Sequence, residues 1–373
     1  MTTSFFRRTA ILAGMSATLS AIAASAAAAP APRAWLVSKD RMQAVLVGES
    51  HLGTPAEKDK YFEAVIRPSY AAADTAVMET YWGAEQRGNE ALDRSLPCPG
   101  DAKDRRTDKV RPAFKELIAA TQENGLKVSN WMEHWETLPE FLHTSLFLDQ
   151  FAEQAFGREY TSAIRTQWGL GTSLRLTESG MGPAENKRRG LESLKDKRAI
   201  FCSASAADRQ DFLADRVLQV AALLRLKQSN PSFAGLDRFA PALGRSLEAT
   251  LRCVDLPVAC AVESLAFDNQ LLRDAGWTTN YSHGTFEILV KQRTRLWVPL
   301  IENAMQTGGK TVIVVGALHL PDLSMGGKLN LGLISQLRVR GYTVTSIAGP
   351  EDLTATFLAP SVSDRIRSWF GQR

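Results

Sequence analysis

Apolar residues along this chain follow two periods, one typical of strands and one typical of helices. Short unbroken apolar runs at 44–47, 76–78 and 312–315 predict buried strands over 44–47, 75–78 and 312–315, and a fourth strand is expected over 342–347. Apolar positions three or four residues apart predict helices from Thr54 and over 112–124, 206–226, 285–305 and 330–340. In the 285–305 helix, the inward-facing stripe is expected to include Leu300. Strands that alternate with helices in this order predict an α/β fold.

Two of the predicted strands end in the same motif of Gly, two residues, His and Leu. The first copy is Gly48-Glu49-Ser50-His51-Leu52, and the second is Gly316-Ala317-Leu318-His319-Leu320. Glycine lets the chain turn sharply as it leaves the sheet, and open α/β sheets bind ligands just beyond the carboxyl ends of their strands. A single His in this place is usually structural. Two histidines in the same strand–Gly–x–x–His motif, in a chain with only five His, favour a functional cleft that His51 and His319 share.

The order of elements predicts a single domain over residues 30–373. We expect two related strand–GxxH–helix halves around a central mixed sheet, with a large helical insertion at about 82–305. No Gly/Ser-rich or Pro-rich linker separates two independent domains.

The first 29 residues have the composition of a cleaved signal peptide. Arg7 and Arg8 precede an apolar stretch at 9–23 and an A-x-A cleavage site at 24–26, and a second cleavage site follows Ala29. An uncleaved anchor is less favoured, because the apolar stretch is short and contains Ser and Thr. We expect export to a bacterial periplasm, with secretion as the second choice, and no integral membrane segment after signal removal.

The net charge limits the expected kinds of binding partner, and the cysteine content indicates the cellular compartment. The formal charge of +4 falls to +2 without Arg7 and Arg8, which gives no reason to expect a nucleic-acid partner. The four Cys suit an oxidising compartment, and none has the C-x-x-C spacing of a thiolate zinc site. Of the three possible pairings, our first choice is Cys253–Cys260 with Cys98–Cys202.

Two imidazoles and a carboxylate make an open metal site that keeps a position for water. The expected ligands are His51, His319 and Glu79, which follows the 75–78 strand and therefore lies at the same sheet edge. Glu49 is placed to act as a general base or as a fourth ligand. Such a site lowers the pKa of bound water and polarises a carbonyl, which is hydrolytic chemistry. The sequence contains no H-E-x-x-H helix, G-x-S-x-G elbow, P-loop or dinucleotide fingerprint.

Arg293 and Trp297 share one face of the helix that precedes the second motif, because they are four residues apart. Arg293 could orient a substrate carboxylate or Glu192, and the alternative is a surface Arg that packs over Trp297. Gly48, Glu192 and Gly316 are expected to support the site or to contact substrate.

These motifs, in this order, resemble those of the TraB/GumN family, which includes the Tiki metalloproteases. The matching segments are VGESHLGT (47–54), VME (77–79), GL (169–170), GLES (190–193), RxxxW (293–297), VGALHL (315–320) and GYTV (341–344). Three features depart from the family pattern: Glu49-Ser50 replaces Thr-Ile, Thr294 replaces Asn, and extra residues precede Leu331. The Glu49 form is more similar to the related erythromycin-esterase and ChaN-type proteins.

The resemblance implies a shared α/β fold with an active centre made of the paired motifs and a Glu, and for Tiki-type members a peptidase that uses manganese or cobalt. We therefore expect an exported hydrolase that acts on a peptide or small molecule and depends on a divalent metal (Mn, Co, Zn or Fe). His51, Glu79 and His319 would bind the metal, Glu49 would transfer protons, and Arg293 would position substrate. One alternative is a non-catalytic periplasmic protein that binds a peptide or haem through His51 or His319. The other is a metal-independent esterase in which His51 and Glu49 activate water.

Overall fold

The computed structural model describes residues 33–49, 59–79, 96–98, 109–148, 150–151, 154–155, 172–229, 247–265 and 282–358. The predicted signal peptide and His51 lie outside these ranges. None of the helices within the described ranges has the length and apolarity needed to cross a bilayer.

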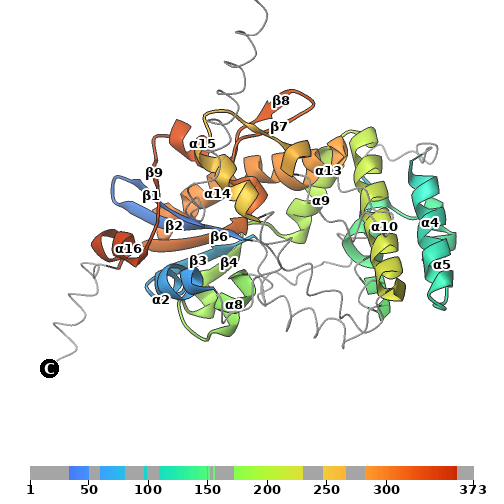
Figure 1. Ribbon diagram of the computed structural model, residues 1–373, viewed down its shortest axis with the longest axis horizontal. Coiled ribbons are helices and arrows are strands. Elements are labelled where there is room, and N and C mark those ends of the chain that lie inside the picture. The colour runs from blue at the N-terminus through green and yellow to red at the C-terminus, as the bar shows by residue number, and fades with distance from the viewer. Residues whose placement is uncertain are drawn as a thin grey trace, which may run out of the picture. The chain divides into compact units, whose positions relative to one another are not determined.

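The centre of the described fold is a mixed sheet of six strands in the order β4-β3-β6-β2-β1-β9 (Figure 1). Its strands are β1 (Ala34–Lys39), β2 (Met42–Glu49), β3 (Thr75–Met78), β4 (Arg188–Gly190), β6 (Lys310–Gly316) and β9 (Thr343–Ser346). Strands β4, β3, β6 and β2 are neighbours and run parallel, whereas β1 is antiparallel to both β2 and β9. The predicted α/β fold with a central mixed sheet is therefore confirmed.

The two strands that carry the repeated motif lie side by side. In the parallel β2–β6 pair, Gly48 is opposite Val315 and Glu49 is opposite Gly316. The two motif glycines are thus one residue out of register at the same edge of the sheet. The repeated motif in the sequence had predicted that these two strands lie close together.

Helices cover both faces of the sheet. Apolar side chains alternate along β2 and β6, so Val45, Val47, Val312 and Val314 share one face. That face packs against η2 (Phe62–Ile66), α2 (Arg67–Ala71), α8 (Thr172–Glu178) and α16 (Pro350–Thr356). Helix α14 (Gln292–Gly308) contacts β2, β3 and β6, and it also packs on α15 (Leu333–Val339), which contacts β9.

A second apolar core lies among helices. Here α10 (Ala206–Ser229) packs along α4 (Val110–Glu123), and Met132 of α5 (Asn130–Glu133) belongs to the same core (Figure 1). The remaining described helices are η5 (Trp135–Thr137), α6 (Glu140–Leu142), η6 (His143–Phe147), η7 (Glu185–Lys187), α9 (Leu194–Ser203), η9 (Cys253–Asp255), η10 (Val262–Leu265), α13 (His283–Phe286), η11 (Glu287–Lys291) and η12 (Ala317–His319).

A small sheet forms around the extra residues that follow the second motif. Strands β7 (Leu323–Met325) and β8 (Lys328–Asn330) make a hairpin, and β5 (Cys260–Ala261) pairs with β7. Both expected disulfides are present, Cys98–Cys202 and Cys253–Cys260. The second disulfide closes a short loop that leads into β5.

Some sequence expectations need correction. Strand β1 was not predicted, although it separates β2 from β9. Leu300 was expected to face inward but is 38% exposed, because it lies on the side of α14 away from the sheet. The predicted 330–340 helix begins only at Leu333, since residues 328–330 pair with β7. Strand β4 and most of helix α14 lie within residues 82–305, the expected helical insertion, and both contact the main sheet.

Candidate functional site

Four parallel strands bring their carboxyl ends to one edge of the main sheet. Glu49 ends β2, and Gly316 ends β6 three residues before His319. Glu79 follows β3 directly, and Glu192 comes two residues after β4. Because these strands are adjacent in the order β4-β3-β6-β2, their ends form one continuous site.

Glu79 is buried and bound from two directions. The backbone N–H of Gly316 donates to its Oε2 atom at 3.0 Å, and Nη2 of Arg293 lies 2.6 Å from its Oε1 atom. The N–H of Glu79 itself donates to the carbonyl of Val314, which continues the β3–β6 pairing by one residue. Both the backbone and the carboxylate of Glu79 are therefore fixed by β6.

Arg293 lies between Glu79 and Glu192. Its Nε atom donates to Oε2 of Glu192 at 2.9 Å, and its Nη2 atom binds the other oxygen of the same carboxylate. Burial opposes the charge on Arg293, but the two carboxylates outweigh it and raise the pKa of the guanidinium. Arg293 is thus a permanent cation that joins β3 to the segment after β4.

Glu192 also accepts hydrogen bonds from other groups. The indole Nε1 of Trp297 donates to its Oε2 atom at 3.2 Å, and Nζ of Lys197 lies 3.7 Å from Oε1. Burial lowers the pKa of Lys197 and nearby Arg293 lowers it further, while Glu192 opposes the change. Helix α9 begins directly after Glu192 with a capping box formed by Ser193 and Asp196, which brings Lys197 back toward Glu192.

His319 is buried at the end of the short helix η12 and is held by α14. Its Nδ1 atom lies 2.7 Å from Oγ1 of Thr294. The ring of Trp297 lies beside it, with ring centroids 4.2 Å apart. The first turns of α14 therefore supply Arg293 to the two carboxylates, and Thr294 and Trp297 to the imidazole.

Glu49 is bound by a residue that the sequence did not indicate. Ser173, at the start of α8, donates its backbone N–H to Oε2 of Glu49 at 2.7 Å and its hydroxyl to Oε1. No local pattern marks Ser173, because it contacts Glu49 only through the fold. Glu49 is buried, and its neighbours Ser50 and His51 lie outside the described residues.

The two motif glycines are required by close packing. A Cβ atom on Gly48 would lie 2.6 Å from Cδ1 of Leu320 and 2.9 Å from Cδ2 of Leu251. A Cβ on Gly316 would lie 3.1 Å from Oε2 of Glu79 and 3.5 Å from Cδ2 of His319. The second measurement also places the Glu79 carboxylate and the His319 ring beside each other.

The structure brings together Glu49, Glu79, Glu192, Arg293 and His319, all of which were singled out from the sequence. Within the described ranges, no group of three or more His, Cys, Asp or Glu side chains has the arrangement of a metal site. The expected third ligand, His51, lies outside those ranges. His319 and Glu79 supply the imidazole nitrogen and carboxylate oxygen that such a site would use.

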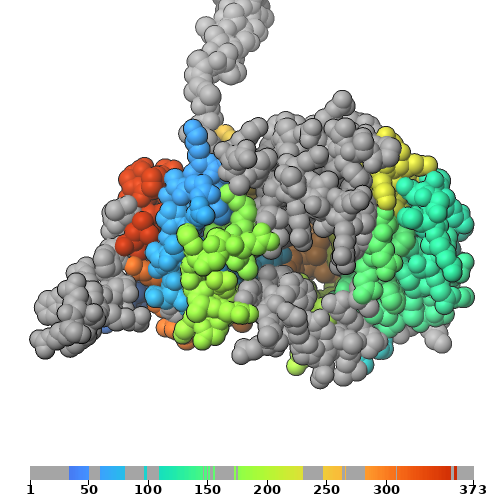
Figure 2. Space-filling view, turned by 90° about the horizontal axis from the view of Figure 1, so that it is seen from below, coloured from blue at the N-terminus to red at the C-terminus, as the bar shows by residue number. Residues whose placement is uncertain are grey.

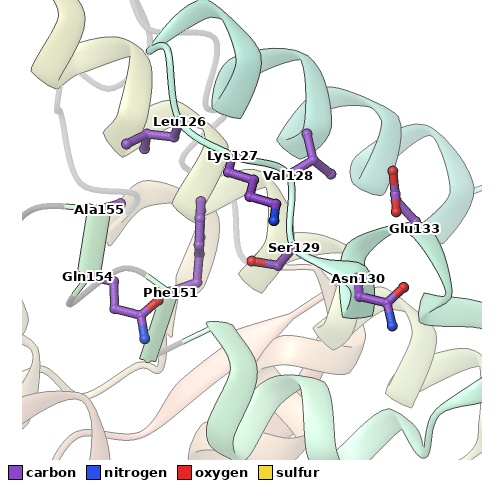
Figure 3. A pocket seen from close by; sticks show the side chains of 9 residues that line it. All are labelled: Leu126, Lys127, Val128, Ser129, Asn130, Glu133, Phe151, Gln154 and Ala155. Atoms are coloured by element: carbon purple, nitrogen blue, oxygen red, sulfur yellow. The ribbon is translucent and has the colours of Figure 1, made fainter.

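A separate hollow of about 650 Å³ lies in the helical part of the chain (Figure 3). Its described lining is Leu126, Lys127, Val128, Ser129, Asn130, Glu133, Phe151, Gln154 and Ala155. None of the predicted site residues lines this hollow. We assign the candidate site to the sheet edge instead, because that is where buried charges and an imidazole meet.

The comparison with known families agrees with this location. The family model described as TraB/PrgY/gumN matches residues 183–346, which include Glu192, Arg293, Gly316 and His319. This match supports the resemblance to the TraB/GumN family that the sequence motifs indicated. Glu49 and Glu79 lie before the matched segment but meet it at the sheet edge. No curated protein and no solved structure matches the chain.

Proposed function

We propose that this protein, which resembles the TraB/PrgY/gumN family, is an exported metal-dependent hydrolase that acts on peptides. The observation that carries the proposal is the meeting of Glu79 and His319 at Gly316. An imidazole and a carboxylate from neighbouring strand ends, both buried, make up two-thirds of the ligand set of an open catalytic metal site. The proposed third ligand is His51.

The donor atoms suit a divalent ion such as Mn, Co, Zn or Fe. Each oxygen of Glu79 makes one hydrogen bond or ion pair described above, and a carboxylate oxygen can accept more than one. The contacts of Glu79 and His319 resemble the outer contacts that orient metal ligands in proteins. When bound, such an ion would lower the pKa of a water molecule and polarise a substrate carbonyl.

The remaining residues would transfer protons, position the substrate or hold other side chains of the site in place. Glu49 would accept a proton from the attacking water, with its carboxylate oriented by Ser173. Arg293 would keep the Glu79 carboxylate aligned, and it would position substrate. Glu192 would hold both Arg293 and Trp297 in place.

Metal content tests this proposal directly. The mature protein would be loaded with Mn, Co, Zn or Fe, dialysed and measured by elemental analysis. We expect about one ion per chain in the wild type, and loss of that ion in His319→Ala. His283→Ala is the matched control, because His283 is exposed and pairs with Asp208 on α10 rather than with the sheet edge. Absence of bound metal under every loading condition would overturn the proposal.

Hydrolysis is tested in a second step with a mixture of unlabelled peptides analysed by mass spectrometry. We expect cleavage that chelation abolishes and that Glu79→Gln lowers at least tenfold. Cleavage of an ester substrate that survives chelation would support the metal-independent esterase instead. Tight binding of peptide or haem that Glu79→Gln leaves unchanged would support a non-catalytic binding protein.

Export is a separate part of the proposal. It is supported by the composition of residues 1–29 and by the two disulfides, which persist in oxidising compartments. Expression of the full chain in a bacterium, fractionation and mass spectrometry would check it. A periplasmic product that begins after Ala26 or Ala29 is expected, and an intact chain in the cytosol would contradict it.

A further inference from the structure

The imidazole of His319 is fixed by two side chains of α14. Thr294 contacts its Nδ1 atom at 2.7 Å, and the ring of Trp297 lies against its side. All three side chains are buried, with Thr294 and Trp297 at 0% exposure. Bulk water therefore does not compete for these contacts, and their geometry determines how the imidazole is protonated.

The direction of the hydrogen bond follows from counting protons. The hydroxyl of Thr294 lies 2.6 Å from the carbonyl oxygen of Val290, one turn earlier in the helix. A carbonyl oxygen can only accept, so the single hydroxyl proton of Thr294 is directed to Val290. The hydroxyl oxygen is then left to accept from His319, and Nδ1 of His319 must carry the donated proton.

We infer that Thr294 is a positioning residue that holds neutral His319 in its Nδ1–H form, so that the lone pair lies on Nε2. Cδ2, the carbon bonded to Nε2, is the ring atom nearest the position of a Cβ on Gly316, beside Oε2 of Glu79. The edge of the ring that includes Nε2 therefore faces the strand ends, while Nδ1 faces α14. The protonation state inferred for His319 does not depend on the proposed function, and only the identity of the group that binds Nε2 rests on it.

The position of the ring proton decides whether Nε2 of His319 can bind a metal or accept a proton. A neutral imidazole has one donor nitrogen and one acceptor nitrogen, and only the acceptor can bind a metal or take up a proton. If Nε2 carried the proton, its edge would be unable to act as a ligand. The partner of the other ring nitrogen commonly sets this choice at metal sites.

Trp297 makes the arrangement rigid. Its indole N–H is fixed on Glu192, and its ring limits rotation of His319 away from Thr294. Thr294 itself cannot swing away without breaking its bond to Val290. The position at which this chain departs from the usual Asn of the family thus has a defined contact with the second motif histidine.

Nuclear magnetic resonance of the imidazole nitrogens tests the inference without any metal. The metal-free protein would be labelled with ¹⁵N-histidine and measured near pH 8, above the ordinary His pKa of about 6.5. The signals of His319 are assigned with His319→Gln. We expect a protonated Nδ1 and an unprotonated Nε2 in the wild type. An Nε2–H form in the wild type would overturn the inference, whatever any variant does.

Three variants separate this role from helix stability. Thr294→Ser keeps the hydroxyl and should keep the Nδ1–H pattern, whereas the similarly shaped Thr294→Val should lose it. Thr307→Val is the control, because Thr307 bonds to the carbonyl of Asn303 in the same helix without contacting a histidine. An unchanged Nδ1–H pattern in folded Thr294→Val would contradict the inference.

Calorimetric titration with Mn²⁺ or Zn²⁺ then links the inference to the proposed site. Thr294→Val should weaken binding about 10- to 100-fold, and Thr294→Ser and Thr307→Val should bind as the wild type does. A wild-type protein that binds no metal but has the expected imidazole pattern would contradict the proposed function and support the inference. Equal metal affinity in Thr294→Val and wild type would overturn the role of Thr294 in ligand positioning.

Discussion

The backbone N–H of Gly316 donates a hydrogen bond of 3.0 Å to Oε2 of Glu79, and this bond joins the ends of two adjacent parallel strands. The contact requires glycine for reasons of space, not of backbone conformation, because Gly316 has φ −56° and ψ 134°. A side chain at this position would enter the gap between the carboxylate and the His319 ring. Neither neighbour can move easily, since Arg293 holds Glu79 and Thr294 holds His319.

Gly316→Ala should therefore disturb the site more than the fold. Crowding of this kind costs about 1–3 kcal/mol of unfolding free energy, and metal binding should weaken in parallel. Urea unfolding and calorimetric metal titration measure the two effects. Adding Glu79→Asp, which shortens the carboxylate side chain, should cost less stability in the Gly316→Ala background than in the wild type. Additive losses in this double-mutant cycle would contradict direct crowding between the two residues.

Glu192→Gln should be among the most destabilising single substitutions at the site. It leaves the buried Arg293 with one carboxylate instead of two, and breaking a buried ion pair costs about 3–5 kcal/mol. Glu302→Gln is the matched control, because it removes the partner of Arg340, which is 46% exposed. Such a surface pair contributes about 0–1 kcal/mol. Equal shifts in the urea midpoint for the two variants would contradict a buried network around Arg293.

Much of the sheet and of its functional edge could be predicted because it depends on local sequence. The unbroken apolar runs identified β2, β3 and β6, and the repeated Gly-x-x-His frame indicated that β2 and β6 are related. Parallel strands must present their carboxyl ends at one edge, so the position of Glu79 followed from its place after β3. The pairing of Arg293 with Glu192 was one of the roles that the sequence analysis considered for Arg293.

The contacts that the sequence did not reveal are those made between distant elements. Ser173 binds Glu49 across 124 residues, and nothing in its own neighbourhood distinguishes it from other serines. Strand β1 carries an apolar run at 34–37 that was not interpreted as a strand, and its place in the sheet comes from pairing with β2 and β9. Thr294 was visible only as a departure from the family pattern. Its hydrogen bond to His319 depends on how α14 packs on β6.

The two disulfides should contribute unequally to stability. Cys98–Cys202 closes a loop with a sequence separation of 104, and Cys253–Cys260 closes one with a separation of 7. In the chain-entropy model, these loops correspond to about 5 and about 2 kcal/mol of unfolding free energy. We expect Cys98→Ser/Cys202→Ser to lower the urea midpoint more than Cys253→Ser/Cys260→Ser does. The reverse order would mean that native contacts of the short loop outweigh the entropy of the unfolded chain.

Asp59 should make the protein sensitive to acid. Its carboxylate accepts hydrogen bonds from Nη1 of Arg33 at 2.8 Å, from Nη1 of Arg175 at 3.2 Å and from the N–H of Phe62 at 3.0 Å. These contacts join the residue directly before β1 to η2 and α8, and the surfaces of α8 and of the segment that contains η2 adjoin each other in Figure 2. Burial alone would raise the pKa of Asp59, but attraction by Arg33, the hydrogen bonds and Arg175 together hold it below 3.8.

A depressed pKa in the folded state means that the stabilisation is complete above the unfolded pKa of about 3.9 and is lost as the pH falls through the folded value. Asp59→Asn should therefore cost about 3 kcal/mol of unfolding free energy at pH 7, and progressively less below about pH 4. Urea unfolding of wild type and variant from pH 7 to pH 2 measures this difference. Glu63→Gln is the control, because Glu63 is an exposed partner of Arg67 and Arg175 and should show a small, nearly pH-independent change. A wild-type-to-Asp59→Asn difference that stays constant into strong acid would show that packing, and not the ionised carboxylate, makes this position important.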